Sequence, residues 1–69
     1  MIKKQINLTI REQEITIYIT EGFTSIQIAK KLLISRRTVE KHRENIMFKL
    51  KVKNMAQLIN SVIKMDLLG

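Results

Sequence analysis

Hydrophobic residues recur along the chain at intervals of three and four, the spacing that places them on one face of an α-helix. The pattern predicts four helices, over about residues 10–21, 25–33, 36–50 and 55–66. The connections between them are very short. We therefore expect an all-α fold in a single domain spanning residues 1–69, built as a four-helix bundle.

Polar residues at the expected helix starts support these boundaries. Three pairs have the spacing of a capping box, in which two residues satisfy each other's backbone N–H groups: Thr9 with Glu12, Thr24 with Gln27, and Asn54 with Gln57. Ser35 can cap the third helix, and Gly22 can take the left-handed conformation that ends the first.

The first helix has a rival interpretation. Residues 14–20 alternate between polar and apolar positions and are rich in β-branched side chains, which is typical of a strand. A single strand would have no pairing partner in a chain otherwise patterned as helices. We therefore expect a helix here.

The third helix has two chemically different faces. One apolar sector holds Val39, His42, Ile46 and Leu50. The opposite sector holds Arg37, Glu40, Lys41, Glu44 and Phe48. A linker of only about two residues joins this helix to the second, which forces a steep crossing between them. Two helices joined in this way, the second long and basic, form the helix-turn-helix arrangement of DNA-binding proteins.

Charge is concentrated in the same part of the chain. The sequence has 13 Lys and Arg against 6 Asp and Glu, a net charge of +7. The whole excess lies in residues 24–53, whereas both ends of the chain are neutral. A basic stripe confined to a helix-turn-helix pair favours a nucleic-acid partner over an ordinary solvated surface.

The composition argues against several other functions. Without cysteine there is no disulfide, thiolate metal site or cysteine nucleophile, and a single histidine cannot form a metal site. We expect no catalytic residues, no cofactor, no metal and no small-molecule ligand in this domain. No apolar run is long enough to cross a membrane and no signal peptide is evident, so we expect a cytoplasmic protein.

Several stretches resemble one known family. They are Leu8-Thr9-Ile10-Arg11-Glu12-Gln13-Glu14, Glu21-Gly22-Phe23-Thr24-Ser25, Ile28-Ala29, the run from Ser35 to Ile46, Lys49-Leu50 and Val52. Together they resemble the LuxR/FixJ-type (GerE-like) helix-turn-helix domain of the winged-helix-like DNA-binding superfamily. The resemblance covers roughly residues 8–65. It implies a bacterial transcription regulator, such as a response regulator, that is located at the nucleoid and whose third helix enters the major groove.

The resemblance also implies roles for individual residues. The base-reading candidates are Arg37, Glu40, Lys41 and Glu44. The phosphate-binding candidates are Thr24, Ser25, Ser35, Arg36, Thr38, Arg43 and Lys49. Basic side chains can donate to guanine or neutralise phosphates, whereas a carboxylate can accept from cytosine. The fourth helix tends to mediate dimerisation in such families, and Ile59 and Ile63 lie partly off its core face. The expected partners are double-stranded DNA, a second copy of the chain and, as a further candidate, RNA polymerase.

Three residues depart from the family pattern. Glu44 stands at a groove position that is often basic, Ile26 replaces a commonly polar residue, and Phe48 occupies a commonly basic position. Two apolar residues without an evident core role are either isolated surface hydrophobes or part of a contact with a partner.

Two further residues have structural interpretations. We expect His42 to be partly buried and hydrogen-bonded to backbone or phosphate. Glu12 is explained by its cap and can also pair with a basic side chain inside the bundle. Acid–base chemistry by Glu12 and Glu14 is disfavoured because residues two apart point to different faces of a helix.

Two other functions remain as alternatives. A protein-interaction module of the same fold would use Ile26, Phe48 and the fourth helix, because a fold does not determine a function. Membrane-surface binding is disfavoured, since the apolar sectors are needed for the core. The sequence is equally compatible with a freestanding regulator and with the C-terminal fragment of a larger one.

Overall fold

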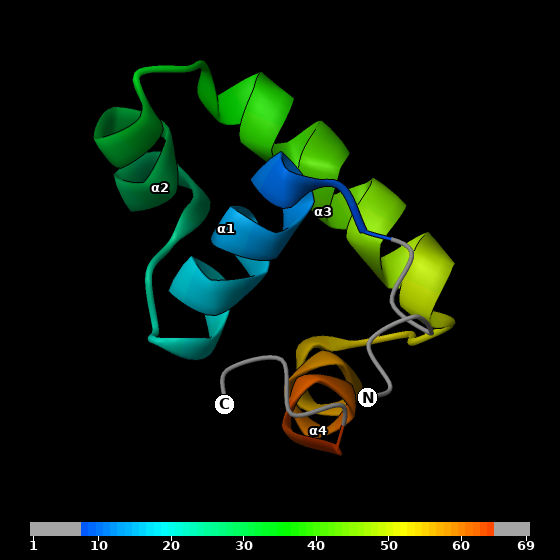
Figure 1. Cartoon of the computed structure of the whole chain (residues 1–69). Helices are drawn as coiled ribbons and strands as arrows, with labels where there is room; N and C mark the ends of the chain where they lie inside the picture. Colours follow the sequence, from blue (N-terminus) through cyan, green and yellow to red (C-terminus); the bar gives the residue numbers. More distant parts are fainter. Residues whose placement is uncertain (1–7, 65–69) are drawn as a thin grey trace.

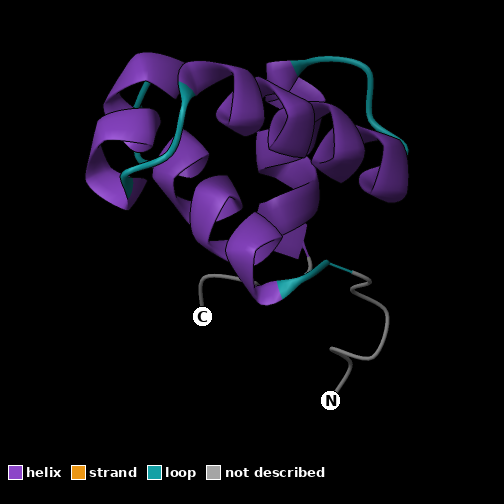
Figure 2. Ribbon diagram, turned by 90° about the horizontal axis from the view of Figure 1, so that it is seen from above, coloured by secondary structure: helices purple, strands orange, loops and turns teal. Residues whose placement is uncertain are grey.

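The computed structural model describes residues 8–64, which form four α-helices and contain no strand (Figures 1 and 2). The helices are α1 Ile10–Thr20, α2 Ser25–Leu32, α3 Arg36–Leu50 and α4 Met55–Lys64. The all-α prediction is confirmed, and the strand interpretation of residues 14–20 is wrong. Helices α1 and α2 end one residue earlier than expected, and the expected end of α4, at 65–66, lies outside the described residues.

Side-chain caps begin the helices where the sequence predicts. The Thr9 hydroxyl accepts from the Glu12 N–H at 3.1 Å, and the Glu12 carboxylate accepts from the Thr9 N–H at 3.0 Å. Thr24 and Gln27 form the same reciprocal pair at the start of α2. Ser35 caps α3 by accepting from the Thr38 N–H at 3.0 Å.

The cap of α4 differs from the expected reciprocal pair. Asn54 Oδ1 accepts from the Gln57 N–H at 2.9 Å, as predicted. The Gln57 side chain, however, accepts from the N–H of Lys53 at 2.8 Å and not from that of Asn54. The Asn54 and Gln57 side chains therefore hold Lys53, a residue of the connection before α4, as well as the start of the helix.

Left-handed residues follow the first three helices. Gly22, after α1, has a φ of 93°, as its sequence position predicts. Leu33 and Lys51, after α2 and α3, have a φ of 57° although each carries a Cβ. Such a conformation costs a non-glycine residue about 1–2 kcal/mol, so the packing on either side of each turn must hold it in place.

The core joins all four helices. Its fully buried apolar side chains are Ile15 from α1, Ile28 from α2, Val39 and Ile46 from α3, and Leu58 and Val62 from α4. Helix α3 packs against α1, α2 and α4 and runs along one side of the molecule (Figure 1). Because Val39 and Ile46 lie on its inward side, the opposite side of α3 faces solvent.

Candidate nucleic-acid interface

The turn between α2 and α3 consists of residues 33–35, one more than the predicted linker of about two. Leu33 reverses the chain through its left-handed conformation, and the Ile34 N–H donates to the Ala29 carbonyl at 3.1 Å. Ile34 packs against the core, and Ser35 then caps α3. This short, anchored turn leads from the end of α2 into the start of α3 (Figure 1), and the two helices pack against each other.

The outward face of α3 carries the predicted base-reading residues. Arg37, Lys41 and Glu44 are all exposed and lie within a sector of about 60° on the helix. Neither Arg37 nor Lys41 makes an ion pair within residues 8–64. Two cationic side chains are thus presented to solvent on the side opposite the core.

Glu40 lies at the edge of this face. Its side chain is about half exposed and forms an ion pair with Arg36 across one helical turn, with 3.7 Å between the carboxylate Oε2 and the guanidinium Nε. Exposed pairs of this kind contribute less than about 1 kcal/mol. Arg36 and Glu40 can therefore exchange this contact for contacts with a ligand at little cost.

Three of the predicted phosphate-binding hydroxyls lie exposed at helix N-termini. They belong to Thr24 before α2 and to Ser35 and Thr38 at the start of α3. The Ser35 and Thr38 hydroxyl oxygens are 2.9 Å apart and share a hydrogen bond. Helix N-termini attract anions because their first N–H groups have no partner within the helix.

Two other phosphate candidates instead join α2 to α3. An Arg43 guanidinium nitrogen donates to the Ser25 hydroxyl at 3.0 Å, and Ser25 is only 7% exposed. The predicted phosphate contact would need an exposed Ser25 hydroxyl, whereas tertiary packing turns this hydroxyl inward. Arg43 is half-buried, so much of its side chain spans the two helices.

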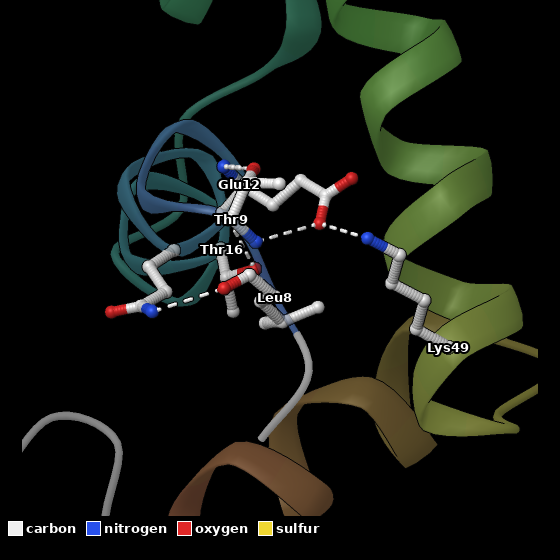
Figure 3. Close-up of polar contacts among 6 residues, drawn as sticks. Leu8, Thr9, Glu12, Thr16 and Lys49 are labelled. Atoms are coloured by element: carbon white, nitrogen blue, oxygen red, sulfur yellow. Dashed lines mark hydrogen bonds and ion pairs between the residues drawn. The ribbon is translucent and has the colours of Figure 1, made fainter. Parts of the chain in front are cut away.

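Lys49 also faces inward. Its ammonium group lies 2.8 Å from Oε1 of Glu12, a residue of α1 that is 4% exposed (Figure 3). This confirms the predicted pairing of Glu12 with a basic side chain inside the bundle. It also places the charge of Lys49, expected on a phosphate, in a contact that holds the C-terminal half of α3 against α1.

The environment of Glu12 favours its ionised form. Burial by itself raises the pKa of this carboxyl. Hydrogen bonds from the Lys49 ammonium and the Thr9 N–H, together with the positive potential of Lys49 and His42, outweigh burial and lower the pKa below its ordinary value. The Glu12–Lys49 pair is therefore charged at neutral pH.

His42 is partly buried, as predicted, and its hydrogen bond to backbone or phosphate stays a prediction. Its Nδ1 atom is enclosed and has no hydrogen-bond partner within residues 8–64. The ring lies on the same side of α3 as Val39 and Ile46 and acts electrostatically on the carboxylate of Glu12.

The apolar residues of α4 divide between the core and the surface, as the sequence predicts. Leu58 and Val62 are buried in the core. Ile59 is half-buried and Ile63 is exposed, so both lie partly off the core face. Their role as dimer contacts stays a prediction.

Sequence reasoning missed Lys51 and Lys53 as candidate site residues. Both are exposed, and they line an open hollow at the C-terminal end of α3 together with Met47, Phe48, Lys49 and Val52. The confinement of excess charge to residues 24–53 was the signal that could have identified them.

The described residues contain no group of three His, Cys, Asp or Glu side chains that could hold a metal ion. None of the helices between residues 8 and 64 is both long and apolar enough to span a membrane.

A short turn between two helices, with the second helix basic on its outward face, defines a helix-turn-helix domain. The particular family is shown by comparison with known proteins: residues 6–62 match the model of the bacterial regulatory proteins, luxR family. The chain belongs to this family, which confirms the resemblance drawn from the sequence.

Individual relatives agree with this assignment. The uncharacterized response regulatory protein YgeK of Escherichia coli is 48% identical over 58 residues, which are 84% of this chain and 40% of that protein. The oxygen regulatory protein NreC of Staphylococcus carnosus is 41% identical over 61 residues, 88% of this chain and 28% of that protein. The chain thus spans less than half the length of these relatives.

Proposed function

We propose that residues 1–69 form one domain that binds double-stranded DNA sequence-specifically, with α3 in the major groove, and controls transcription. The observation that carries the proposal is the position of Arg37 and Lys41. Both are exposed on the side of α3 opposite Val39 and Ile46 and make no ion pair within residues 8–64. A helix whose inner side is buried and apolar and whose outer side carries cations fits a groove lined by phosphates.

The outward residues divide into those that read bases and those that hold the backbone. Arg37 and Lys41 can donate to guanine O6 and N7, and Glu40 and Glu44 can accept from a cytosine amino group. We assign the exposed hydroxyls of Thr24, Ser35 and Thr38, with Arg36 and the outer part of Arg43, to phosphates. For Ser25, only its backbone N–H at the start of α2 is proposed as a phosphate donor.

Lys49 is proposed to act on DNA only indirectly. Its ammonium group is paired with the buried carboxylate of Glu12, so moving it to a phosphate would leave that carboxylate without its counter-charge. Lys49 therefore supports the interface by holding α3 in place. Lys51 and Lys53, both exposed beyond the end of α3, are better placed to neutralise phosphates.

We further propose that the bound form is a dimer on a two-fold site, joined through α4. Ile59 and Ile63 lie off the core face of that helix and would form a small apolar contact between two copies. Two half-sites about one helical turn of DNA apart would then match the two copies.

The test is fluorescence anisotropy with a duplex selected from a random-sequence library by the full chain, repeated over a series of salt concentrations. Neutralisation of about six phosphates predicts a slope near −5 in a log–log plot of affinity against salt. A scrambled duplex of equal length serves as the control and should bind at least about a thousand-fold more weakly. A flat salt response, or equal affinity for both duplexes, would contradict the proposal.

Contact with RNA polymerase is a second candidate function, favoured by the outer face of α2. Ile26 and Leu33 lie seven residues apart on this helix and its cap, and both are exposed. Exchange of both for serine should abolish co-purification with the polymerase while leaving DNA affinity unchanged. Retained co-purification would exclude this surface.

A further inference from the structure

Phe48 is the feature of the outward face that the proposed function leaves unexplained. Its side chain is 84% exposed, although burial of an aromatic ring is strongly favourable. A basic residue is expected at this position from the family resemblance. A single exposed hydrophobic residue is common at protein surfaces, so the case for a ligand of Phe48 depends on the position and surroundings of the ring.

The position of Phe48 on α3 connects it to the base-reading residues. It follows Arg37, Lys41 and Glu44 at intervals of eleven, seven and four, so all four lie within about 60° of one another around the helix. It is thus on the side proposed to enter the groove, one turn beyond Glu44.

The distance along α3 also matches the repeat of DNA. Seven residues separate Lys41 from Phe48, or about 10 Å of helix. If α3 follows the groove, this spans about three base pairs at about 3.4 Å each. Phe48 would therefore meet a base pair about three steps from the one that Lys41 reads.

The surroundings of Phe48 indicate an anionic partner with an apolar spot. The ring shares an open hollow with Met47 and Val52, and the hollow is flanked by the exposed Lys51 and Lys53. The major groove combines two rows of phosphates with one kind of apolar group, the C5-methyl of thymine, which side chains such as Phe contact.

We propose that Phe48 packs against a thymine methyl in the major groove and makes the chain prefer thymine at one position of its site. This inference rests on the proposed function. The ring replaces the phosphate contact of a basic side chain with readout of a base. Lys51 and Lys53 then hold the backbone on either side.

The experiment exchanges each thymine of the selected duplex, one at a time, for deoxyuridine, which differs only by lacking the C5-methyl. Anisotropy with the full chain should show one position per half-site at which the exchange weakens binding about three- to five-fold. That position should lie about three base pairs from the base pair that Lys41 reads. The latter is the base pair whose substitution weakens binding of the unaltered chain but not of K41A.

Variants of Phe48 connect the effect to this side chain. F48A should bind the thymine and deoxyuridine duplexes equally, because the methyl group has lost its partner. F48L, which keeps an apolar side chain, should retain part of the difference. I10A removes an equally exposed side chain from α1 and should behave like the unaltered chain. Far-ultraviolet circular dichroism checks that each variant is folded.

The outcomes separate this inference from the proposed function. Specific, salt-dependent binding with no position sensitive to deoxyuridine, or with a sensitivity that survives in F48A, would overturn the role of Phe48 and leave the regulator proposal standing. If F48A instead lost only an acidic protein partner, the hollow would be a protein-docking surface and the inference would be wrong. Absence of any specific DNA binding would overturn both.

Discussion

The basic residues of α3 and its flanks form two groups, one that faces solvent and one that contacts the neighbouring helices. Arg37 and Lys41 project into solvent from the N-terminal half of the helix. Arg43 and Lys49 reach back to the neighbouring helices, to the hydroxyl of Ser25 and the carboxylate of Glu12. The same basic segment therefore contains cations that are exposed to solvent and cations that hold the helices together.

The two inward contacts differ in what their loss would cost. Ser25 is neutral, so removal of Arg43 leaves an uncharged hydroxyl without its donor. Glu12 is 4% exposed and ionised, so removal of Lys49 leaves a buried charge without its counter-ion. We therefore expect the inward cations, Arg43 and Lys49, to determine the stability of the fold. We expect the outward cations, Arg37 and Lys41, to determine affinity for DNA.

The largest expected effect is on the Glu12–Lys49 pair. Lys49→Met should lower the free energy of unfolding by about 2–4 kcal/mol. This is somewhat less than the roughly 3–5 kcal/mol lost when a fully buried pair is broken, because the Lys49 side chain is 29% exposed. Urea titration followed by circular dichroism measures it. A chain this small has little stability to spare, so the variant is expected to be largely unfolded at 37 °C.

The double variant Glu12→Gln, Lys49→Met is the matched control. It removes both charges and should recover much of the lost stability, because no unpaired carboxylate remains. If Lys49→Met kept full stability and lost DNA affinity instead, Lys49 would belong to the phosphate-binding group. Its assignment to the inward, stabilising cations would then be wrong.

Lys41→Ala sharpens the other side of the comparison. It should weaken binding to the selected duplex by about 1–3 kcal/mol and change binding to random DNA little, as expected for a base-reading side chain. The unfolding midpoint should stay unchanged because the side chain is exposed. Lys64→Ala, which removes an exposed cation from α4, is the control and should affect neither quantity.

A smaller effect is expected in the turn that joins the two helices. Leu33 is 90% exposed and has a left-handed backbone. Leu33→Asn should raise the free energy of unfolding by about 1 kcal/mol, because asparagine tolerates this conformation and no packing is lost. Ile10→Asn, at an exposed position in α1, should give no such gain. An unchanged or lower stability of Leu33→Asn would show that the turn carries no strain.

The smallest effect concerns acidic pH. Because the pKa of Glu12 is lower in the folded chain than in the unfolded chain, its contribution to stability is fully present above the unfolded value and is lost as the pH falls through the folded value. Unfolding midpoints measured from pH 7 down to pH 3 should fall less steeply for Glu12→Gln. Parallel curves for the two proteins would contradict the assigned pKa.

Interactions within a few residues of one another could be predicted from the sequence. The capping pairs of Thr9 with Glu12 and Thr24 with Gln27 each lie within one helical turn, so their spacing was sufficient evidence. The same holds for Gly22 after α1 and for the inward stripe that contains Val39 and Ile46. Local geometry and a period of about 3.6 residues dictate these features wherever the chain folds.

The particular partners that meet between helices were beyond such reasoning: the sequence predicted a basic partner for Glu12 but did not identify it as Lys49. The sequence places Ser25 and Lys49 beside exposed residues, and only the crossing of α2, α1 and α3 brings them to Arg43 and Glu12, 18 and 37 residues away. Long side chains can turn to either side of a helix, and the neighbour with the stronger charge or the better hydrogen bond decides which. The sequence alone thus determined four helices, their starts and a basic segment; tertiary packing decided which of its cations face solvent, because that depends on partners distant in the chain.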